Sequence, residues 1–455
     1  MARGILLAIP AALGVAASGA LAQVNPGAPP AAISADYALT NVRIVTAPGR
    51  VIERGTIVIR NGRIAAVGAQ VTVPAGVVQM DLNGHSVFPG LIDAATSVGL
   101  PSTARPPATT PAGGAPQGRG GGGRGGNNPG LVPTVNQPPA PAPEPTLPEL
   151  DASAEAADMF SPTADQLKNL RAGGVTTVGL VFDGGIFPGR VGAALTGGPN
   201  EDRLSLRTAA GQNVSFGTRR GGYPSTLIGA LAFVRQALLD AQYEARLDKA
   251  FKAGVPGARP TNEPFTRALV PAATNEMPAW FVASTERQIN RVADITKELG
   301  LKGPVVVGAQ EGWRVAPTLK AMGATAVVSL NWPNPLGVTG ASFAGGTPDQ
   351  NAVTAEIRRN AAALARAGVP VALASYGGES GSSFRDRIRS TIEAGMSPDD
   401  ALRAATVTPA ALLGVTAAVG TIEVGKLANL VVVTGNDLFA SGTPIRHVFV
   451  EGRLY

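Results

Sequence analysis

The sequence contains no cysteine among its 455 residues, and it has only two histidines. The absence of cysteine excludes disulfides, thiolate metal sites, a cysteine nucleophile and lipid attachment through an N-terminal cysteine. His85 lies in the turn-like stretch "LNGHSVFPG" and His447 in "IRHVFVEG", both in β-rich ends of the chain. A centre that needs several histidines in the middle of the chain is therefore excluded.

Long apolar runs are also scarce. The first residues, "MARGILLAIPAALGVAASGALA", place Arg3 before an apolar run that ends in small residues. This layout predicts a secretory signal peptide over residues 1–22, cleaved before Gln23. A membrane anchor is disfavoured because Gly14 and Ser18 interrupt the run. We expect an exported protein, periplasmic in a Gram-negative source, with no membrane association after cleavage.

No basic cluster accompanies the formal net charge of +6, which is spread along the chain. Residues 101–148 are rich in proline and glycine and include "RGGGGRGG", a pattern typical of nucleic-acid-binding segments. Only Arg119 and Arg124 are charged in that run, so we expect no nucleic-acid partner. A segment of this composition cannot bury a core, which predicts a disordered insertion.

Both ends of the chain outside the leader show short β-rich runs. In "GTIVIRNGRIAAVG", Asn61-Gly62 can adopt the positive φ values of a two-residue hairpin turn between two alternating runs. The stretches "ANLVVVTGNDL" and "IRHVFVEGRLY" have the same character. We predict one composite β-sandwich, built from residues 36–88 and 419–455.

Strand and helix patterns alternate between residues 89 and 418. Helix starts are expected at Ser161 with Pro162, at Thr285 with Gln288, and at Ser397 with Pro398. Buried strands such as "VTTVGLVF" and "VPVALAS" follow helices. Because no Gly-rich phosphate loop follows the first strand, this α/β pattern favours a parallel (β/α)8 TIM-type barrel over an open sheet.

Two stretches resemble the amidohydrolase superfamily, specifically its imidazolonepropionase-like branch. They are "VFPGLIDAATSVGL" and "ALRAATVTPAALLGVTAAVGTIEVGKLANLVVV". The resemblance extends from Tyr37 to Tyr455 and leaves out the insertion. It implies hydrolysis of C–N bonds other than peptide bonds, as in cyclic amides, and also of dipeptides, with zinc or another divalent metal at the C-terminal ends of barrel strands.

The resemblance also implies the positions of the metal ligands, and this sequence replaces every one. The two histidines of a His-x-His fall on Ala95 and Ser97. Two later histidines fall on Val282, or its neighbour Ala283, and on Gly308. The aspartate falls on Tyr376. We therefore predict no metal cofactor and no catalytic residue.

Other polar residues near expected strand ends leave alternative sites open. Candidates for an all-oxygen magnesium or calcium site, or for lining a pocket, are Asp93, Asp183, Gln310, Glu311, Trp313 and Glu379. Asp183 with Glu311 or Glu379 would form a glycosidase-like carboxylate pair. Asp93 shares strand parity with Ala95, so we expect it inside the barrel, where a hydrogen bond is the preferred role. Ser97, Ser329 and Ser375 would lack a histidine base.

These observations predict an exported amidohydrolase-family protein that has lost the metal centre. It would act as a pseudoenzyme or as a non-catalytic subunit beside a homologous active amidohydrolase. Two alternatives stay open. One is an active hydrolase of an amide or cyclic amide with a non-standard site; the other is a periplasmic protein that binds a small molecule at the barrel mouth. Arg219 and Arg220 would then bind an acidic ligand, or form a solvated surface pair.

Overall fold

The computed structural model describes residues 36–101, 151–198, 204–218, 224–332, 348–378 and 381–455. The predicted signal peptide and nearly all of the predicted insertion lie outside these residues, as do Arg219, Arg220 and Glu379. All described residues belong to one unit, Ser34–Tyr455.

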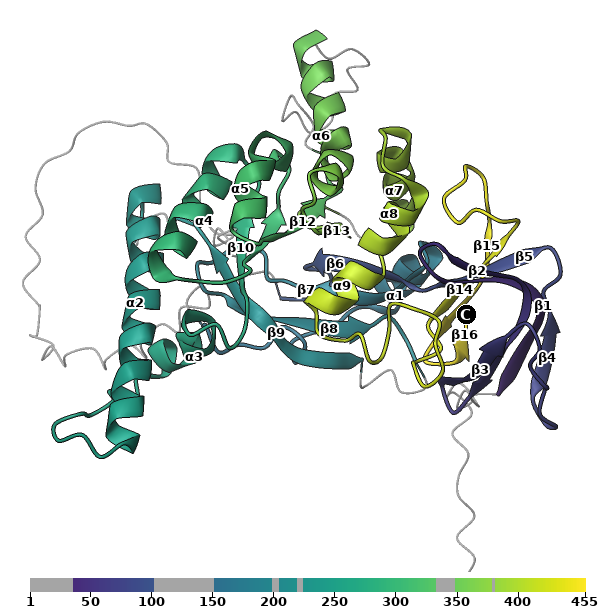
Figure 1. The fold of residues 1–455 in the computed structure, drawn as a ribbon, viewed down its shortest axis with the longest axis horizontal. Helices are drawn as coiled ribbons and strands as arrows, with labels where there is room; N and C mark the ends of the chain where they lie inside the picture. Colours follow the sequence, from purple (N-terminus) through teal and green to yellow (C-terminus); the bar gives the residue numbers. More distant parts are fainter. Residues whose placement is uncertain (1–35, 102–150, 199–203, 219–223, 333–347, 379–380) are drawn as a thin grey trace, which may run out of the picture. The chain divides into compact units, whose positions relative to one another are not determined.

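The two ends of this unit meet in one eight-stranded sheet (Figure 1). The strand order is β16-β15-β14-β5-β1-β2-β3, with β4 beside β1. The strands are β1 (Tyr37–Ala47), β2 (Arg50–Arg60), β3 (Arg63–Gly68), β4 (Val78–Asp81), β5 (His85–Pro89), β14 (Leu430–Thr434), β15 (Ile445–Val450) and β16 (Arg453–Leu454). Strands from both ends are thus interleaved, which confirms the predicted composite domain.

The turn between β2 and β3 is formed by the two residues that the sequence predicted for it. Arg60 pairs with Arg63, and the two residues between them have φ values of 49° at Asn61 and 75° at Gly62. Asparagine and glycine adopt this left-handed region at little steric cost, and the turn matches the twist of the flanking strands. Ile57 and Ile59 on β2 then lie buried in the core of this sheet.

A second eight-stranded sheet has the order β13-β12-β11-β10-β9-β8-β7-β6. Its strands are β6 (Leu91–Thr96), β7 (Val175–Leu180), β8 (Gly189–Leu195), β9 (Ser205–Ser215), β10 (Ala279–Ala283), β11 (Val305–Gly308), β12 (Thr325–Ser329) and β13 (Val371–Ala374). The two end strands, β6 and β13, also contact one another. The sheet is therefore a nearly closed barrel, as the strand–helix alternation predicted.

One strand departs from the expected parallel arrangement. β8 runs antiparallel to both of its neighbours, β7 and β9. Its connections are residues 181–188 and 196–204. A crossover between parallel strands needs a dozen or more residues, usually a helix, so these short connections produce hairpins instead. The prediction of an all-parallel barrel is wrong at this strand.

The barrel begins where the composite sheet ends, because β5 and β6 are separated only by Gly90. A Cβ atom at residue 90 would lie 2.1 Å from the Thr176 hydroxyl oxygen. Only glycine allows this close approach of the chain to the start of β7. The first barrel strand is therefore fixed in place by its connection to the composite sheet.

Helices follow most of the barrel strands and pack around the outside (Figure 1). They are α1 (Ala164–Ala172), α2 (Leu227–Lys252), α3 (Pro264–Ala273), α4 (Glu286–Leu299), the short 3-10 helix η2 (Gly312–Val315), α5 (Ala316–Ala321), α6 (Pro348–Arg366), α7 (Ser383–Glu393), α8 (Pro398–Ala404) and α9 (Val407–Leu412). No helix among the described residues is both long and apolar enough to cross a membrane.

The helix starts test the capping predictions. Thr285 and Gln288 form the predicted capping box before α4, and Ser397 caps α8 with Pro398 at its first position. The prediction for α1 is wrong, because Thr163 rather than Ser161 is the cap. Thr163 forms a complete capping box with Gln166, which satisfies two backbone N–H groups instead of one.

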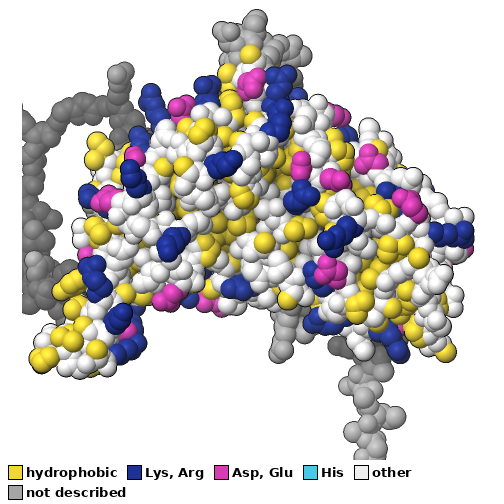
Figure 2. Space-filling view, viewed as in Figure 1, with side chains coloured by type: hydrophobic (Ala, Val, Ile, Leu, Met, Phe, Trp, Pro, Cys, Tyr) yellow, Lys and Arg dark blue, Asp and Glu magenta, His cyan; other side chains and the backbone are white. Residues whose placement is uncertain are grey.

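Charged side chains are mixed over the surface. Figure 2 shows Lys and Arg interspersed with Asp and Glu across the face it presents. This distribution agrees with a net charge that is spread along the sequence. Interspersed charges of both signs keep a surface hydrated without creating a field of one sign.

A buried carboxylate fixes the chain between α2 and α3. Glu244 is 2% exposed and accepts hydrogen bonds from the Thr261 N–H at 3.0 Å, the Thr261 hydroxyl at 2.9 Å and the Asn262 N–H at 2.8 Å. Burial by itself raises the pKa of Glu244, but these hydrogen bonds and the charge of Arg267 outweigh it and lower the pKa. The ionised form therefore stabilises the folded chain.

We predict that Glu244→Gln reduces the free energy of unfolding at neutral pH by about 1–3 kcal/mol, because an amide cannot accept all three bonds. Since the folded pKa lies below the unfolded one, this advantage of the wild type is present above the unfolded pKa and declines as pH falls through the folded pKa. Urea unfolding at several pH values measures it. The exposed Glu276→Gln is the control; equal effects of the two substitutions would contradict the prediction.

Candidate functional site

The barrel interior at the expected metal positions is apolar. Ala95 is fully buried in the cluster that fills the barrel, together with Val305, Val307 and Trp280. Val282 and Tyr376 are partly buried and pack against the same cluster. Ser97 is half-buried just after β6. The side chains at these positions thus supply neither an imidazole nor a carboxylate.

Gly308, at the end of β11, has a backbone conformation that disfavours a side chain. Its φ is 97°, and a Cβ atom would lie 2.4 Å from the Ser284 hydroxyl oxygen. L-residues rarely adopt this backbone conformation, and the contact is shorter than any stable van der Waals distance. Val307, one residue earlier, lies in the apolar cluster. A histidine is therefore excluded at 308 without local rearrangement.

The two histidines lie in the composite sheet, away from the barrel strands. His85 begins β5 and its Nδ1 lies 3.1 Å from the Asn83 carbonyl oxygen, while His447 is on β15 opposite Val432. Burial lowers the pKa of His447, and the nearby His85 and Arg446 lower it further. The expectation that neither histidine belongs to a barrel centre agrees with these positions.

Asp93 closes the seam of the barrel. It is fully buried, and its carboxylate accepts the Ser375 N–H at 2.9 Å and the Ser375 hydroxyl at 2.5 Å. Ser375 directly follows β13, so the pair joins the two end strands of the sheet. Asp93 thus has the hydrogen-bonding role that the sequence favoured. Hydrogen bonds to an ionised carboxylate are stronger than bonds between neutral groups.

The expected shared parity of Asp93 and Ala95 does not hold. Ile92 and Ala94 contribute to the cluster inside the barrel, and Ala95 does so too. The pairing of β6 with β7 is irregular between Asp93 and Thr96, which is the effect of a bulge. Asp93 consequently turns towards β13, whereas Ala95 faces the interior.

Glu311 and Gln310 also hold the backbone. Glu311 accepts the Glu286 N–H at 2.8 Å, which satisfies a free donor at the start of α4. Gln310 donates to the Asn331 carbonyl at 2.6 Å. Both residues follow β11, where the sequence predicted them, but their polar atoms fix neighbouring loops.

Trp313 lies beside a polar residue that sequence reasoning missed. The backbone N–H of Trp313 donates to the Asn360 side-chain oxygen at 2.9 Å, and the Asn360 side-chain amide donates to the Ala309 carbonyl at 2.8 Å. Asn360 is fully buried on α6. The sequence held one sign of this role: Asn360 begins the run "NAAALA", whose apolar residues are typical of the buried face of a helix.

The structure brings Asp183 and Tyr376 together. Burial raises the pKa of Tyr376 well above its ordinary value, and the negative charge of Asp183 raises it further. Asp183 is exposed in the connection between β7 and β8. The described residues contain no group of three or more His, Asp or Glu able to hold a metal ion.

The described side chains therefore do not fit the family's metal centre. Of the residues predicted to line a pocket, Asp93, Glu311 and Gln310 bind backbone or serine groups, and the charge of Asp183 acts on Tyr376. Glu379 lies outside the described residues. Three cavities, on the outer helices and at the composite sheet, are lined by other residues.

Two family models match the chain. Residues 274–455 match the amidohydrolase family, and residues 37–87 match the NagA composite domain. The first match contains barrel strands β10 to β13 and the returning composite strands; the second contains β1 to β4. Residues 274–455 are thus similar to the amidohydrolase family, and residues 37–87 to the NagA composite domain. No curated protein sequence matches it.

Solved structures share the fold. An amidohydrolase from Thermotoga maritima MSB8 has a TM-score of 0.68 at 20% identity, over 92% of this chain and 99% of that one. A putative prolidase from Bifidobacterium longum has a TM-score of 0.53 at 19% identity, over 93% and 95%. A Xaa-Pro dipeptidase with methionine in its active site has a TM-score of 0.52 at 16% identity, over 92% and 99%.

We predict that Asp93→Asn destabilises the protein by about 1–3 kcal/mol, because the amide lacks the negative charge that strengthens both bonds to Ser375 and keeps only one acceptor oxygen. Chemical denaturation measures the loss. Asp294→Asn, at an exposed position on α4, is the control and should change stability by less than about 0.5 kcal/mol. If the two substitutions have the same effect, Asp93 does not close the barrel.

Proposed function

We propose that this protein is a pseudoenzyme of the amidohydrolase superfamily that keeps the barrel without a metal centre. The observation that carries the proposal is the apolar packing at the metal positions, with Ala95 in the barrel cluster, Val282 packed against it, and a backbone at Gly308 that disfavours a side chain. The match of residues 274–455 to the amidohydrolase family supports a hydrolytic ancestor. The side chains at the expected metal positions support loss of metal-dependent hydrolysis.

The loss would be large in energetic terms. A catalytic metal lowers the pKa of its bound water to about 7, far below that of free water, which corresponds to about 12 kcal/mol of hydroxide stabilisation. The described carboxylates are not placed to replace it, because Asp93 and Glu311 already accept backbone N–H groups. An active hydrolase with a non-standard site is therefore the less favoured alternative.

The proposal extends to location and partner. The apolar leader with a small-residue end supports export, and the periplasm is the expected compartment in a Gram-negative source. A retained fold without chemistry is suited to a non-catalytic subunit beside a homologous active amidohydrolase. Such a subunit would stabilise or position its active partner through the fold they share.

We expect a metal content near zero per chain when the mature protein is purified without chelator, incubated with zinc, manganese or magnesium, desalted and measured by elemental mass spectrometry. The His85→Ala/His447→Ala variant is the matched control, because it removes every histidine and leaves the barrel unchanged. One or two metal ions per chain, retained in this variant, would refute the loss of the metal centre.

The partner is tested separately. We predict that the tagged chain, purified from its native host at low salt, is recovered together with a homologous chain that carries the complete ligand set. Mass spectrometry identifies the second chain, and size-exclusion chromatography shows whether the two elute together. Recovery of homo-oligomers alone would contradict the partner proposal while leaving the metal result unaffected.

A further inference from the structure

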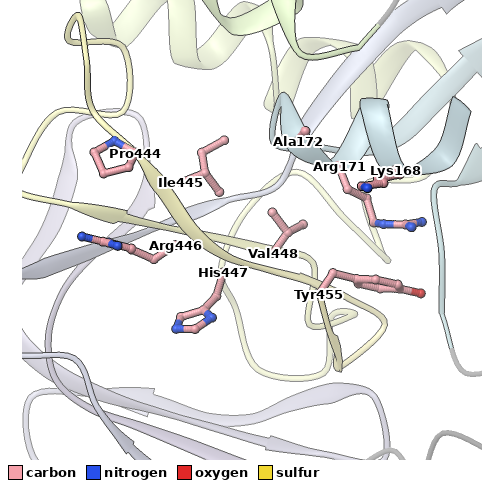
Figure 3. Close-up of a pocket in the computed structure, with 9 residues that line it drawn as sticks. All are labelled: Lys168, Arg171, Ala172, Pro444, Ile445, Arg446, His447, Val448 and Tyr455. Atoms are coloured by element: carbon pink, nitrogen blue, oxygen red, sulfur yellow. The ribbon is translucent and has the colours of Figure 1, made fainter. Parts of the chain in front are cut away.

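A basic groove separates α1 from the end of the composite sheet (Figure 3). Its volume is about 530 Å³, within the usual range of sites for small organic ligands. It is lined by Lys168, Arg171, Ala172, Pro444, Ile445, Arg446, His447, Val448 and Tyr455. None of these residues is acidic, and three of them carry a permanent positive charge.

The cationic end of the groove is held in a defined geometry. The Arg171 guanidinium carbon lies 4.0 Å from the centroid of the Tyr455 ring, and Arg171 also donates to the Thr196 carbonyl. A second guanidinium carbon, that of Arg453, lies 5.2 Å from the same centroid. The Tyr455 hydroxyl accepts the Gly198 N–H at 3.0 Å. An arginine ordered in this way loses little conformational entropy when it binds an anion.

Lys168 adds a second positive charge to the same end. It lies one turn before Arg171 on α1, so both side chains project from one face of the helix, as Figure 3 shows. Lys168 is exposed and Arg171 is half-buried. A carboxylate between them would accept bonds from two cations while it remains partly shielded from water.

The middle of the groove is apolar. Ile445, Val448 and Ala172 lie between the Lys168–Arg171 end and the Arg446–His447 end (Figure 3). Arg446 is already bonded to the Thr434 hydroxyl at 3.0 Å. A fully hydrated ion such as phosphate would leave this apolar surface exposed. A ligand with an apolar body would cover it.

We propose that this groove binds an organic monocarboxylate with an apolar body, its carboxylate between Lys168 and Arg171 and its body against Ile445 and Val448. The site lies outside the barrel and needs neither metal nor turnover. It gives the protein a ligand-binding activity that is independent of the family's reaction. Ligand binding tests the groove, whereas metal content tests the pseudoenzyme proposal, so either proposal can fail without the other.

The test is calorimetric titration of the full mature chain with naphthylacetate. Naphthylethanol is the control that keeps the apolar body without the charge, and inorganic phosphate is the control that keeps a negative charge without an apolar body. We expect naphthylacetate to bind at least about tenfold more tightly than either, the effect of one or two charge-assisted bonds. Equal affinity for naphthylethanol would remove the carboxylate from the proposal, and equal affinity for phosphate would remove the apolar body. Either result overturns it, as does absence of naphthylacetate binding.

Variants locate the site. Lys168→Met should weaken naphthylacetate binding about tenfold, and Ala172→Asp should abolish it by placing a negative charge at the groove. Both positions are exposed, so both chains should fold. Lys249→Met, which removes an exposed lysine in the last turn of α2, is the matched control. Unchanged binding in the first two variants, or equal weakening in the control, would refute the assignment.

Discussion

Closure of the barrel depends on one buried carboxylate. The ladders of the second sheet join each strand to its neighbour in order, but β6 and β13 meet as the two ends of that order. Asp93 joins them by binding both the N–H and the hydroxyl of Ser375. The position of every element between these strands follows from this closure, because a barrel fixes strand tilt and spacing together.

The same logic extends to the other polar residues at the barrel mouth. Strand ends at this face are where barrel enzymes place catalytic groups. Here Glu311 binds the start of α4 and Gln310 binds a neighbouring loop. In both cases the bond holds a neighbouring element in place.

Local patterns predicted local structure well. Asn61-Gly62 specified its hairpin and Thr285 its capping box, because the deciding interactions lie within a few residues. The direction of β8 was missed because it depends on the length of two connections, and the side of Asp93 because a bulge shifts the parity of β6. The partnership of Asp93 with Ser375 spans 282 residues of sequence, so no local pattern indicates it. Composition alone, with two histidines, excluded a histidine-rich barrel.

The backbone at Gly308 limits what can be built at the end of β11. Two obstacles meet a side chain there, and they differ in strength. The Ser284 hydroxyl lies at the end of a side chain that can rotate away, whereas the φ of 97° is set by the chain on both sides. Anyone who engineers a ligand onto this strand end would therefore have to rebuild the loop after β11 and not merely exchange one residue.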